Sequence, residues 1–481
     1  MRELFDTKTD TNEVNRQLSF IEEGRKTVSE LADQAGRKLT ACVVTFGCQM
    51  NARDSEKLSG ILEHMGYVLT DNEEADFVIY NTCTVRDNAN QKVYGKLGTL
   101  NAYKKRNKLM KIALCGCMTQ EEVVIDKIQK SYPFVDLVFG THNLYAFPEL
   151  FVQMMQRDLM IVDVWESTTK IVEDLPIVRK YPFKSGVNIM FGCDKFCTYC
   201  IVPYVRGRER SREPEEIVCE IEKLVADGVK EVMLLGQNVN SYGKNLPLKT
   251  TFPELLRMIE KIEGLERIRF MTPYPSDFGD DMIECMRNSK KICKHIHLPL
   301  QSGSSRILKR MNRRYTKEEF LELALKLRKE LPDVALTTDI IVGFPGETEE
   351  DFNILKDNLR KWKFDRLGCF IFSPEEGTPA YDMPDQIDEE IKQKRYDEIY
   401  ELQKEISSEQ SKKRLGTVTR VNICSVSDDG IFYIGRSYGE SPEVDPVIYI
   451  ASQEEELKIG EFYDAKIVDC SDDYDMTAVT I

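Results

Sequence analysis

Three cysteines at the spacing CxxxCxxC lie in the stretch FGCDKFCTYC, at Cys193, Cys197 and Cys200. Thiolates are soft ligands that suit zinc or iron–sulfur clusters. Three close ligands on a four-iron cube leave one iron free for a small molecule, whereas zinc usually takes a fourth ligand, and none follows Cys200. Packing cysteines are the weaker interpretation because Asp194, Lys195 and Thr198 make the loop polar. We call these three residues the loop trio.

A second set of cysteines is spread along the N-terminal part of the chain. Cys48 in FGCQMN, Cys83 in NTC and Cys117 in CGCMTQ each follow an apolar run typical of a buried strand. The carboxyl ends of neighbouring parallel strands meet at one crevice, so these three residues, the sheet trio, are candidate ligands of one metal centre. Cys42 and Cys115 fall inside the runs and are expected in the core.

The elements that must position the sheet trio alternate between apolar runs and amphipathic stretches. Residues 39–165 contain the strand candidates LTACVVTFG, ADFVIYNT, LMKIALCGC, VDLVFG and LMIVDVW, separated by helical patterns. This alternation predicts an α/β fold with a doubly wound parallel sheet. Residues 1–38 are expected to form a helical extension, and residues 166–184 a linker.

A second alternating series at residues 185–415 must position the loop trio. Its strand candidates are VNIMFG, EVMLLGQ, RIRFMTP, HIHLPLQSG, ALTTDIIVGF and RLGCFIF, and a long polar helix closes it. Six β/α units predict a partial (β/α)6 barrel, in which Cys193 follows the first strand at the carboxyl face, where such folds place active sites. Residues 416–481 are expected to form a small antiparallel β domain.

The composition narrows the protein class. The chain has 481 residues, 14 cysteines, no apolar run of spanning length and no apolar signal region, so we expect a cytoplasmic protein with reduced thiols and no membrane partner. A net charge of -15 argues against a uniform nucleic-acid-binding surface. His295 and His297 are expected in the core or in pocket walls, while His64 and His142 look incidental.

The loop trio resembles that of the radical S-adenosylmethionine (SAM) enzymes. In that superfamily the CxxxCxxC cysteines bind a 4Fe-4S cluster, and SAM binds the unique iron. GQNVNSYG and DIIVGFPGE are polar or glycine-rich turns expected at the same barrel face, where backbone could approach a nucleotide. The resemblance therefore implies a SAM pocket, and its candidate wall residues are Tyr199, Gln237, Asn238, Asp339 and Gly343.

Both trios together resemble the methylthiotransferase family. The motifs FGCQMNARDSE, NTCTVRDNA, CGCMTQ, FGCDKFCTYCIVPYVRGRERSR and LLGQNVNSYG are specific to it. The resemblance implies two 4Fe-4S clusters and two SAM molecules per turnover. The sheet trio would hold an auxiliary cluster bearing the sulfur to be donated, and the loop trio the cluster that generates a 5′-deoxyadenosyl radical. An electron donor such as flavodoxin or ferredoxin and a monomeric state are also expected.

The expected substrate is the anticodon arm of tRNA, with methylthiolation at carbon 2 of N6-isopentenyl-adenosine. Up to about residue 364 the motifs resemble the tRNA branch of the family. Basic clusters at residues 96–111, in RGRERSR and in RILKRMNRR favour a phosphate-bearing partner. The candidate contacts in two of these clusters are Lys104, Lys105, Arg206, Arg208 and Arg210.

Two alternatives remain open at this point. Beyond about residue 367 the sequence resembles the sister branch that methylthiolates an aspartate of a basic ribosomal protein, and its terminal module resembles that branch's TRAM domain. Residues 416–481 hold 4 Lys and Arg against 14 Asp and Glu, which would repel a phosphate backbone. The second alternative is a non-enzymatic RNA-binding protein with structural metal sites.

Overall fold

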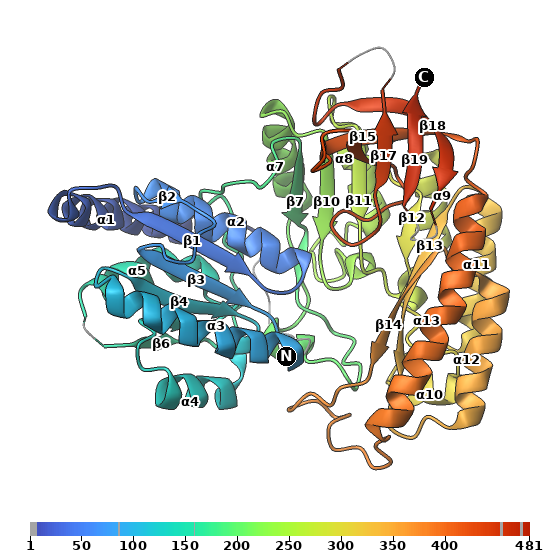
Figure 1. The fold of residues 1–481 in the computed structure, drawn as a ribbon, viewed down its shortest axis with the longest axis horizontal. Helices are drawn as coiled ribbons and strands as arrows, with labels where there is room; N and C mark the ends of the chain where they lie inside the picture. The colour runs from blue at the N-terminus through green and yellow to red at the C-terminus, as the bar shows by residue number, and fades with distance from the viewer. Residues whose placement is uncertain (1–6, 85–86, 158, 453–455, 472–474) are drawn as a thin grey trace.

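The computed structural model describes residues 7–84, 87–157, 159–452, 456–471 and 475–481. The first six residues of the expected N-terminal extension and Val85 and Arg86 of the NTCTVRDNA motif lie outside the described residues. Figure 1 shows an α/β region in blue, a half-open arrangement of strands and helices from green to orange, and a small β barrel in red. Among the described helices, none is long and apolar enough to cross a membrane.

The N-terminal region is built on a six-stranded sheet in the order β2-β1-β3-β4-β5-β6, in which every neighbouring pair is parallel. The strands are β1 (Thr40–Thr45), β2 (Val68–Leu69), β3 (Phe77–Thr82), β4 (Lys111–Gly116), β5 (Leu137–Phe139) and β6 (Ile161–Asp163). The five runs predicted as strands all form strands, which confirms the parallel sheet. The two-residue edge strand β2 carried too few residues to give a pattern.

Helices cover both faces of this sheet, as a doubly wound fold requires. The helices are α1 (Thr11–Ala35), α2 (Gln49–His64), α3 (Asp87–Arg106), α4 (Glu122–Ser131) and α5 (Phe147–Met155). Leu58 of α2, Phe151 of α5 and Ile21 of α1 share one apolar core, and Leu97 of α3 and Ile128 of α4 belong to another. Cys42 and Cys115 are buried in these cores, in line with the expectation.

The central region has six parallel strands in two sheets of three, ordered β11-β10-β7 and β12-β13-β14. These strands are β7 (Lys184–Asn188), β10 (Glu231–Leu235), β11 (Arg267–Phe270), β12 (His295–His297), β13 (Ala335–Val342) and β14 (Arg366–Ile371). A parallel bridge between Ile268 and Ile292 joins the two sheets, so the strands form one partial barrel. A short antiparallel ribbon, β8 (Met190–Phe191) with β9 (Arg210–Ser211), flanks the cysteine loop.

Most helices of this region pack outside the strands, whereas the short α6 (Val202–Val205) continues the cysteine loop. The others are α7 (Pro214–Ala226), α8 (Phe252–Glu260), α9 (Asp280–Asn288), α10 (Ser305–Arg310), α11 (Lys317–Glu330), α12 (Glu349–Trp362) and α13 (Glu389–Lys412). Local sequence fixes where several begin. Thr251, Thr316 and Thr348 each cap a helix by a reciprocal capping box with the acidic residue three positions later.

The C-terminal region is a closed five-stranded barrel in the order β15-β16-β17-β19-β18. Its strands are β15 (Val418–Val426), β16 (Tyr433–Arg436), β17 (Ile448–Ala451), β18 (Phe462–Cys470) and β19 (Met476–Thr480). All neighbours are antiparallel except β17 and β19, which run parallel because β19 closes the barrel between β17 and β18. The expected antiparallel β domain is therefore present with one parallel pair.

The C-terminal barrel docks on the amino ends of the central strands. Arg267 and Arg269 at the start of β11 donate to the backbone carbonyls of Ser437, at 3.4 and 2.6 Å. Arg366, the first residue of β14, donates to the carbonyl of Gly439 at 2.7 Å. The cysteine loop follows β7 and β8 at the opposite, carboxyl ends, so the acidic module lies at the far end of the barrel from the loop trio (Figure 1).

Within residues 166–184, expected as a linker, the stretch 173–178 runs along helix α2. The Val178 N–H donates to the carbonyl of Glu56 at 3.0 Å, and Lys57 forms a buried ion pair with Glu173 at 2.6 Å. Gly60 permits this approach, since a Cβ there would lie 2.4 Å from the Cα of Ile177. The segment therefore ties the N-terminal sheet domain to the central barrel.

Candidate functional site

The loop trio lies between β8 and α6 on a loop that neighbouring backbone holds in place. The Cys193 N–H donates to the carbonyl of Gly207 at 3.0 Å, and the Cys200 N–H to that of Cys197 at 2.9 Å. Thr198 donates its N–H to the Met311 carbonyl at 3.1 Å, and its own carbonyl accepts from Ala380 at 2.8 Å. The three thiols therefore belong to one fixed loop.

The electrostatics of this loop suit a bound cationic centre. Burial raises the pKa of both Cys193 and Cys200 to about 12, and the neighbouring thiols add to the effect. Metal ligation needs thiolates, so positive charge must compensate the burial. Arg313 supplies part of it, with Nη1 3.6 Å from the Cys197 sulfur. The remaining charge would come from the metal centre itself.

A single zinc ion and a four-iron cluster need different arrangements of protein ligands. Within the part of the chain that the structure describes, no three Cys, His, Asp or Glu side chains converge as one metal ion requires. A mononuclear zinc site needs four donors at one point, whereas a four-iron cube binds its thiolates at separate corners. The three cysteines of the loop trio match the number of protein ligands that a four-iron cube with one open iron takes.

Asn238 supports the cysteine loop through a polar chain. It is buried, and its Nδ2 donates to Asp277 at 3.0 Å. Asp277 forms an ion pair with Lys195, between the first two cysteines of the loop trio, at 2.6 Å. Asn238, which was expected in the SAM pocket wall, is therefore linked to the cysteine loop through Asp277.

The other expected pocket residues have differing surroundings. Tyr199 is half-buried beside the ring of Phe344, 6.5 Å away between centroids. Asp339 contacts His297, with Oδ2 3.3 Å from Nε2. Gly343 faces helix α13, because a Cβ there would lie 2.3 Å from Cγ of Lys392.

Gln237 differs from these residues because its side-chain oxygen is a buried hydrogen-bond acceptor without a donor among the described residues. Its Nε2 donates to the sulfur of Met50 on α2, while its buried Oε1 has no hydrogen-bond partner among the described residues. A buried unpaired oxygen is costly unless a ligand or water satisfies it. Gln237 is thus the pocket candidate that most clearly requires a donor from outside the protein.

The sheet trio assembles where three neighbouring strands end. Gly47, next to Cys48, has a φ of 113°, and a Cβ there would lie 2.8 Å from the sulfur of Cys83. The Cys117 N–H donates to the carbonyl of Thr82, the residue before Cys83, at 2.9 Å. The three residues that the sequence places far apart therefore adjoin in the fold.

Asn51, in the first turn of α2, ties these strand ends together. It is buried, and its Nδ2 donates to the carbonyls of Phe46 and Thr82 at 2.8 and 2.9 Å. Its Oδ1 lies 3.8 Å from the sulfur of Cys48. Asn51 lies within the motif FGCQMN, but nothing in its spacing distinguished it from an ordinary helix residue.

The two trios adjoin at one interdomain junction. Cys117 shares a small apolar cluster with Ile201 and Val205, which directly follow the loop trio. Thr141, after β5, donates to the carbonyl of Val205 at 2.5 Å. The sheet domain therefore presents its trio to the segment that leaves the cysteine loop.

Arg206 lies buried in this junction and not at a substrate surface. It is 7% exposed, and it contacts Asp54 at 3.0 Å, Asn51 at 2.6 Å and the Cys117 sulfur at 3.4 Å. Arg210, 5% exposed, donates to the carbonyls of Thr168 and Lys170. Both were expected to contact substrate, but their guanidinium groups are enclosed and already paired within the protein.

The remaining substrate candidates differ in availability. Arg208 is exposed and forms a surface ion pair with Asp194 at 3.0 Å. Lys105 is exposed on α3, whereas Lys104 is partly buried and donates to the Phe134 carbonyl at 2.7 Å. Arg208 and Lys105 are therefore the two candidates whose placement suits a phosphate partner.

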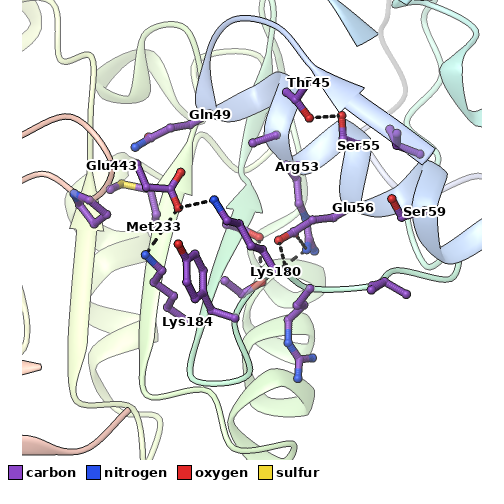
Figure 2. Close-up of a pocket in the computed structure, with 18 of the residues that line it drawn as sticks. Thr45, Gln49, Arg53, Ser55, Glu56, Ser59, Lys180, Lys184, Met233 and Glu443 are labelled. Carbon is purple, nitrogen blue, oxygen red and sulfur yellow. Dashed lines mark hydrogen bonds and ion pairs between the residues drawn. The ribbon is translucent and has the colours of Figure 1, made fainter. Parts of the chain in front are cut away.

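A cavity of about 680 Å³ extends from the sheet trio toward the C-terminal barrel. Its walls include Cys48 together with residues of β1, α2, β7 and β10. Figure 2 shows Lys180 and Lys184 directed at Glu443 across this space, each 3.7 Å from its Oε1. The cavity thus lies where all three regions of the protein meet.

The comparisons with known proteins agree with this architecture. Residues 187–359 match the radical SAM superfamily, residues 40–140 the uncharacterized protein family UPF0004 and residues 409–481 the TRAM domain. The radical SAM methyltransferase TsrM from Kitasatospora setae has a TM-score of 0.53 at 14% identity, covering 72% of this chain and 75% of that one. This likeness confirms the fold of the sheet domain and partial barrel.

Sequence relatives are much closer. The tRNA-2-methylthio-N(6)-dimethylallyladenosine synthase of Lachnoclostridium phytofermentans is 57% identical over 410 residues, covering 85% of this chain and 90% of the relative. The enzyme of that name from Acetivibrio thermocellus is 51% identical over 430 residues, covering 89% of each.

The fold and the loop trio define a radical SAM enzyme, a class that uses a 4Fe-4S cluster and SAM. Within that class the chain belongs to the family of tRNA-2-methylthio-N(6)-dimethylallyladenosine synthases. This confirms the methylthiotransferase resemblance of the sequence motifs.

Proposed function

We propose that this protein inserts a methylthio group at carbon 2 of N6-isopentenyl-adenosine, next to the anticodon of tRNA. The observation that supports it most directly is the junction at which Arg206, the residue directly after α6, contacts Cys117 of the sheet trio. Two separate cysteine trios are thereby brought to one place. The relatives that cover most of the chain bear the name of this activity.

The loop trio would hold the 4Fe-4S cluster that binds SAM, and the sheet trio a second 4Fe-4S cluster, with two SAM molecules consumed per turnover. When bound, these groups supply the one-electron, methyl and sulfur chemistry that a carbon–hydrogen bond without an acidic proton demands. The chain holds the thiolates in position through the backbone of Thr198 and the side chain of Asn51. Gln237 would offer its unpaired oxygen to SAM.

Tyr199 and Asp339 are the further SAM-wall candidates, while Asn238 and Gly343 would act from behind the pocket. Asn238 holds the cysteine loop through Asp277, and Gly343 allows α13 to pack closely against the end of β13. A SAM molecule at the carboxyl ends of the barrel strands would follow the usual placement of ligands in such folds.

The tRNA anticodon arm would be attracted by exposed basic residues around the junction, among them Arg208 and Lys105. The acidic C-terminal module docks on the amino ends of the barrel strands. Its charge is therefore offset from the carboxyl ends, where a phosphate backbone would approach.

The acidity of that module favours one other substrate, a basic ribosomal protein methylthiolated on an aspartate. We rank it second because both trios and the barrel belong to the part of the chain whose motifs resemble the tRNA branch. We further propose that the enzyme works as a cytoplasmic monomer with a flavodoxin or ferredoxin as electron donor.

One reaction tests the substrate. The reconstituted protein, with SAM and a reductant, is offered hypomodified tRNA and the small-subunit ribosomal protein together. A methylthio product on tRNA is expected; a product on the ribosomal protein alone would overturn the assignment. Iron analysis should give about eight irons per chain for two four-iron clusters, and about four would remove the second cluster from the proposal.

A further inference from the structure

Each cysteine trio has one arginine that donates to one of its sulfurs. Arg206 Nε lies 3.4 Å from the Cys117 sulfur of the sheet trio, and Arg313 Nη1 lies 3.6 Å from the Cys197 sulfur of the loop trio. Arg206 is more enclosed than Arg313, which is half-buried. The pairing of one guanidinium with one thiol thus occurs twice, in two regions with unrelated folds.

Arg206 reaches the sheet trio from the other domain. It follows α6, which continues the cysteine loop of the barrel, and it ends in a pocket formed by Asn51, Asp54 and Cys117 of the sheet domain. A guanidinium has five donors in a fixed plane. Here Nη1 binds the carboxylate, Nη2 the amide oxygen and Nε the sulfur.

Arg206 makes more contacts than an ion pair between the two domains requires. Asp54 alone would neutralise the arginine, yet the guanidinium also contacts Cys117, the residue that directly follows β4. Hydrogen bonds to cluster sulfurs and nearby positive charge stabilise the reduced, more negative state of an iron–sulfur centre. The guanidinium is enclosed, so water would not screen this effect.

We propose that Arg206 is a positioning residue that holds Cys117 for the auxiliary cluster and raises the reduction potential of that cluster by donating to the cysteine sulfur. The inference rests on the proposed function, since it requires a cluster on the sheet trio. It also makes a residue of the barrel a determinant of the neighbouring domain's metal centre.

The test isolates the two clusters. The full-length C193A/C197A/C200A protein should bind only the auxiliary cluster, and the C48A/C83A/C117A protein only the cluster of the loop trio. Each protein is reconstituted anaerobically with iron and sulfide, alone and with Arg206→Met. Iron content is measured, and the cluster is titrated with a reductant and followed by electron paramagnetic resonance.

In the C193A/C197A/C200A background, Arg206→Met should lower the midpoint potential. The reference is the C193A/C197A/C200A protein with Arg206 intact. At the midpoint potential of this reference, the ratio of reduced to oxidised cluster in the Arg206→Met variant should be at least tenfold lower, which is equivalent to a shift of about 59 mV for one electron. In the C48A/C83A/C117A background the same change should leave the midpoint unaltered. An unshifted auxiliary midpoint with full iron content would overturn the inference.

Two further variants separate the possible failures. Arg206→Lys keeps the charge but loses the planar fork, and it should recover part of the shift; it also serves if Arg206→Met does not fold. Arg313→Met is the reciprocal control and should shift only the cluster of the loop trio. If the C193A/C197A/C200A protein binds no iron at all, the second cluster of the proposed function fails and this inference fails with it, whereas an iron-loaded but unshifted protein rejects Arg206 alone.

Discussion

The two cysteine trios reach the same junction by opposite structural routes. The loop trio lies within eight consecutive positions, and backbone hydrogen bonds such as that from Thr198 to Met311 hold it. The sheet trio comes from three strand ends, and side chains hold it, chiefly Asn51 and Arg206. A local site thus depends on its own loop, and a dispersed site on the whole domain.

The dispersed site is possible because neighbouring strands end in step. Thr45 of β1 pairs with Asn81 of β3, and Thr82 of β3 pairs with Gly116 of β4. Each cysteine follows one to three residues after these pairs. Sheet register therefore does for the sheet trio what sequence spacing does for the loop trio.

Two glycine substitutions should give the largest effect, because each should remove the iron of one trio and leave that of the other. Gly116 has a φ of 102°, and a Cβ there would lie 2.2 Å from the carbonyl oxygen of Thr82. Gly116→Ala should therefore remove the iron of the sheet trio, about half of the total, and leave that of the loop trio. Iron analysis together with electron paramagnetic resonance of each cluster measures this.

The opposite result is expected for Gly192→Ala, whose Cβ would lie 2.1 Å from the carbonyl oxygen of Arg208. Gly98→Ala is the matched control, because a Cβ at this helical position meets nothing within 4 Å and alanine favours helices. Equal loss of both clusters in Gly116→Ala and Gly192→Ala would contradict the separate construction of the two sites.

Asn51→Ala should destabilise the sheet domain next most strongly. It leaves the carbonyl of Phe46 and a donor of Arg206 unpaired in a buried place, and it removes one of the two hydrogen bonds that the carbonyl of Thr82 accepts. At about 1–3 kcal/mol for each unsatisfied group, the loss of unfolding free energy should reach about 4 kcal/mol. Urea denaturation of the metal-free protein measures it, and a loss below about 1 kcal/mol would show that Asn51 does not hold the strand ends.

The junction should also weaken in mild acid because of His142. Burial, with Arg210 and Arg206 nearby, lowers its pKa from 6.5 to about 4. The unfolded chain therefore takes up this proton first, and stability falls as the pH drops from about 6.5 toward 4, by about 3 kcal/mol in total.

His142→Gln should remove this component of the pH dependence. The measurement is the difference in unfolding free energy between the metal-free proteins at several pH values across that window. Parallel curves for the two proteins would show that His142 is not held neutral by the fold.

The smallest effect should come from the surface of the junction. Arg208 is exposed, so Arg208→Ala should weaken tRNA binding a few-fold at all salt concentrations and reduce the slope of log K against log salt by about one. Iron content should stay unchanged in this variant. Filter binding across a salt series checks the slope, and an unaltered slope would remove Arg208 from the interface.

The two sites were predictable from the sequence through different signals. The loop trio follows from spacing alone, and the sheet trio from the repeated place of Cys48, Cys83 and Cys117 after apolar runs, which the parallel sheet explains. The alternation of strand and helix patterns, and its change to short strands after residue 415, also predicted the order of the three regions along the chain. Very short elements such as β2 left no periodic pattern to detect.

The supporting side chains could not be found in this way. RGRERSR contains four arginines that look alike in sequence, yet Arg206, Arg210 and Arg212 are buried and only Arg208 is exposed. Which of them faces the sheet domain depends on how two domains dock, and that contact has no local pattern. His142, which looked incidental, is buried against Gly207 for the same reason.

The seam between the barrel and the C-terminal module has a consequence for how such enzymes diversify. Three arginines of the barrel donate hydrogen bonds to backbone carbonyls of residues 436–440, and every amino acid has such a carbonyl; they are Arg267, Arg269 and Arg366. These contacts recognise the path of the backbone, and ion pairs such as those of Arg366 with Asp445 and of Lys230 with Glu461 add a few side-chain contacts to the joint. A module with a different charge elsewhere on its surface could therefore be attached to the same catalytic body, as long as it keeps this backbone path and these few ion pairs.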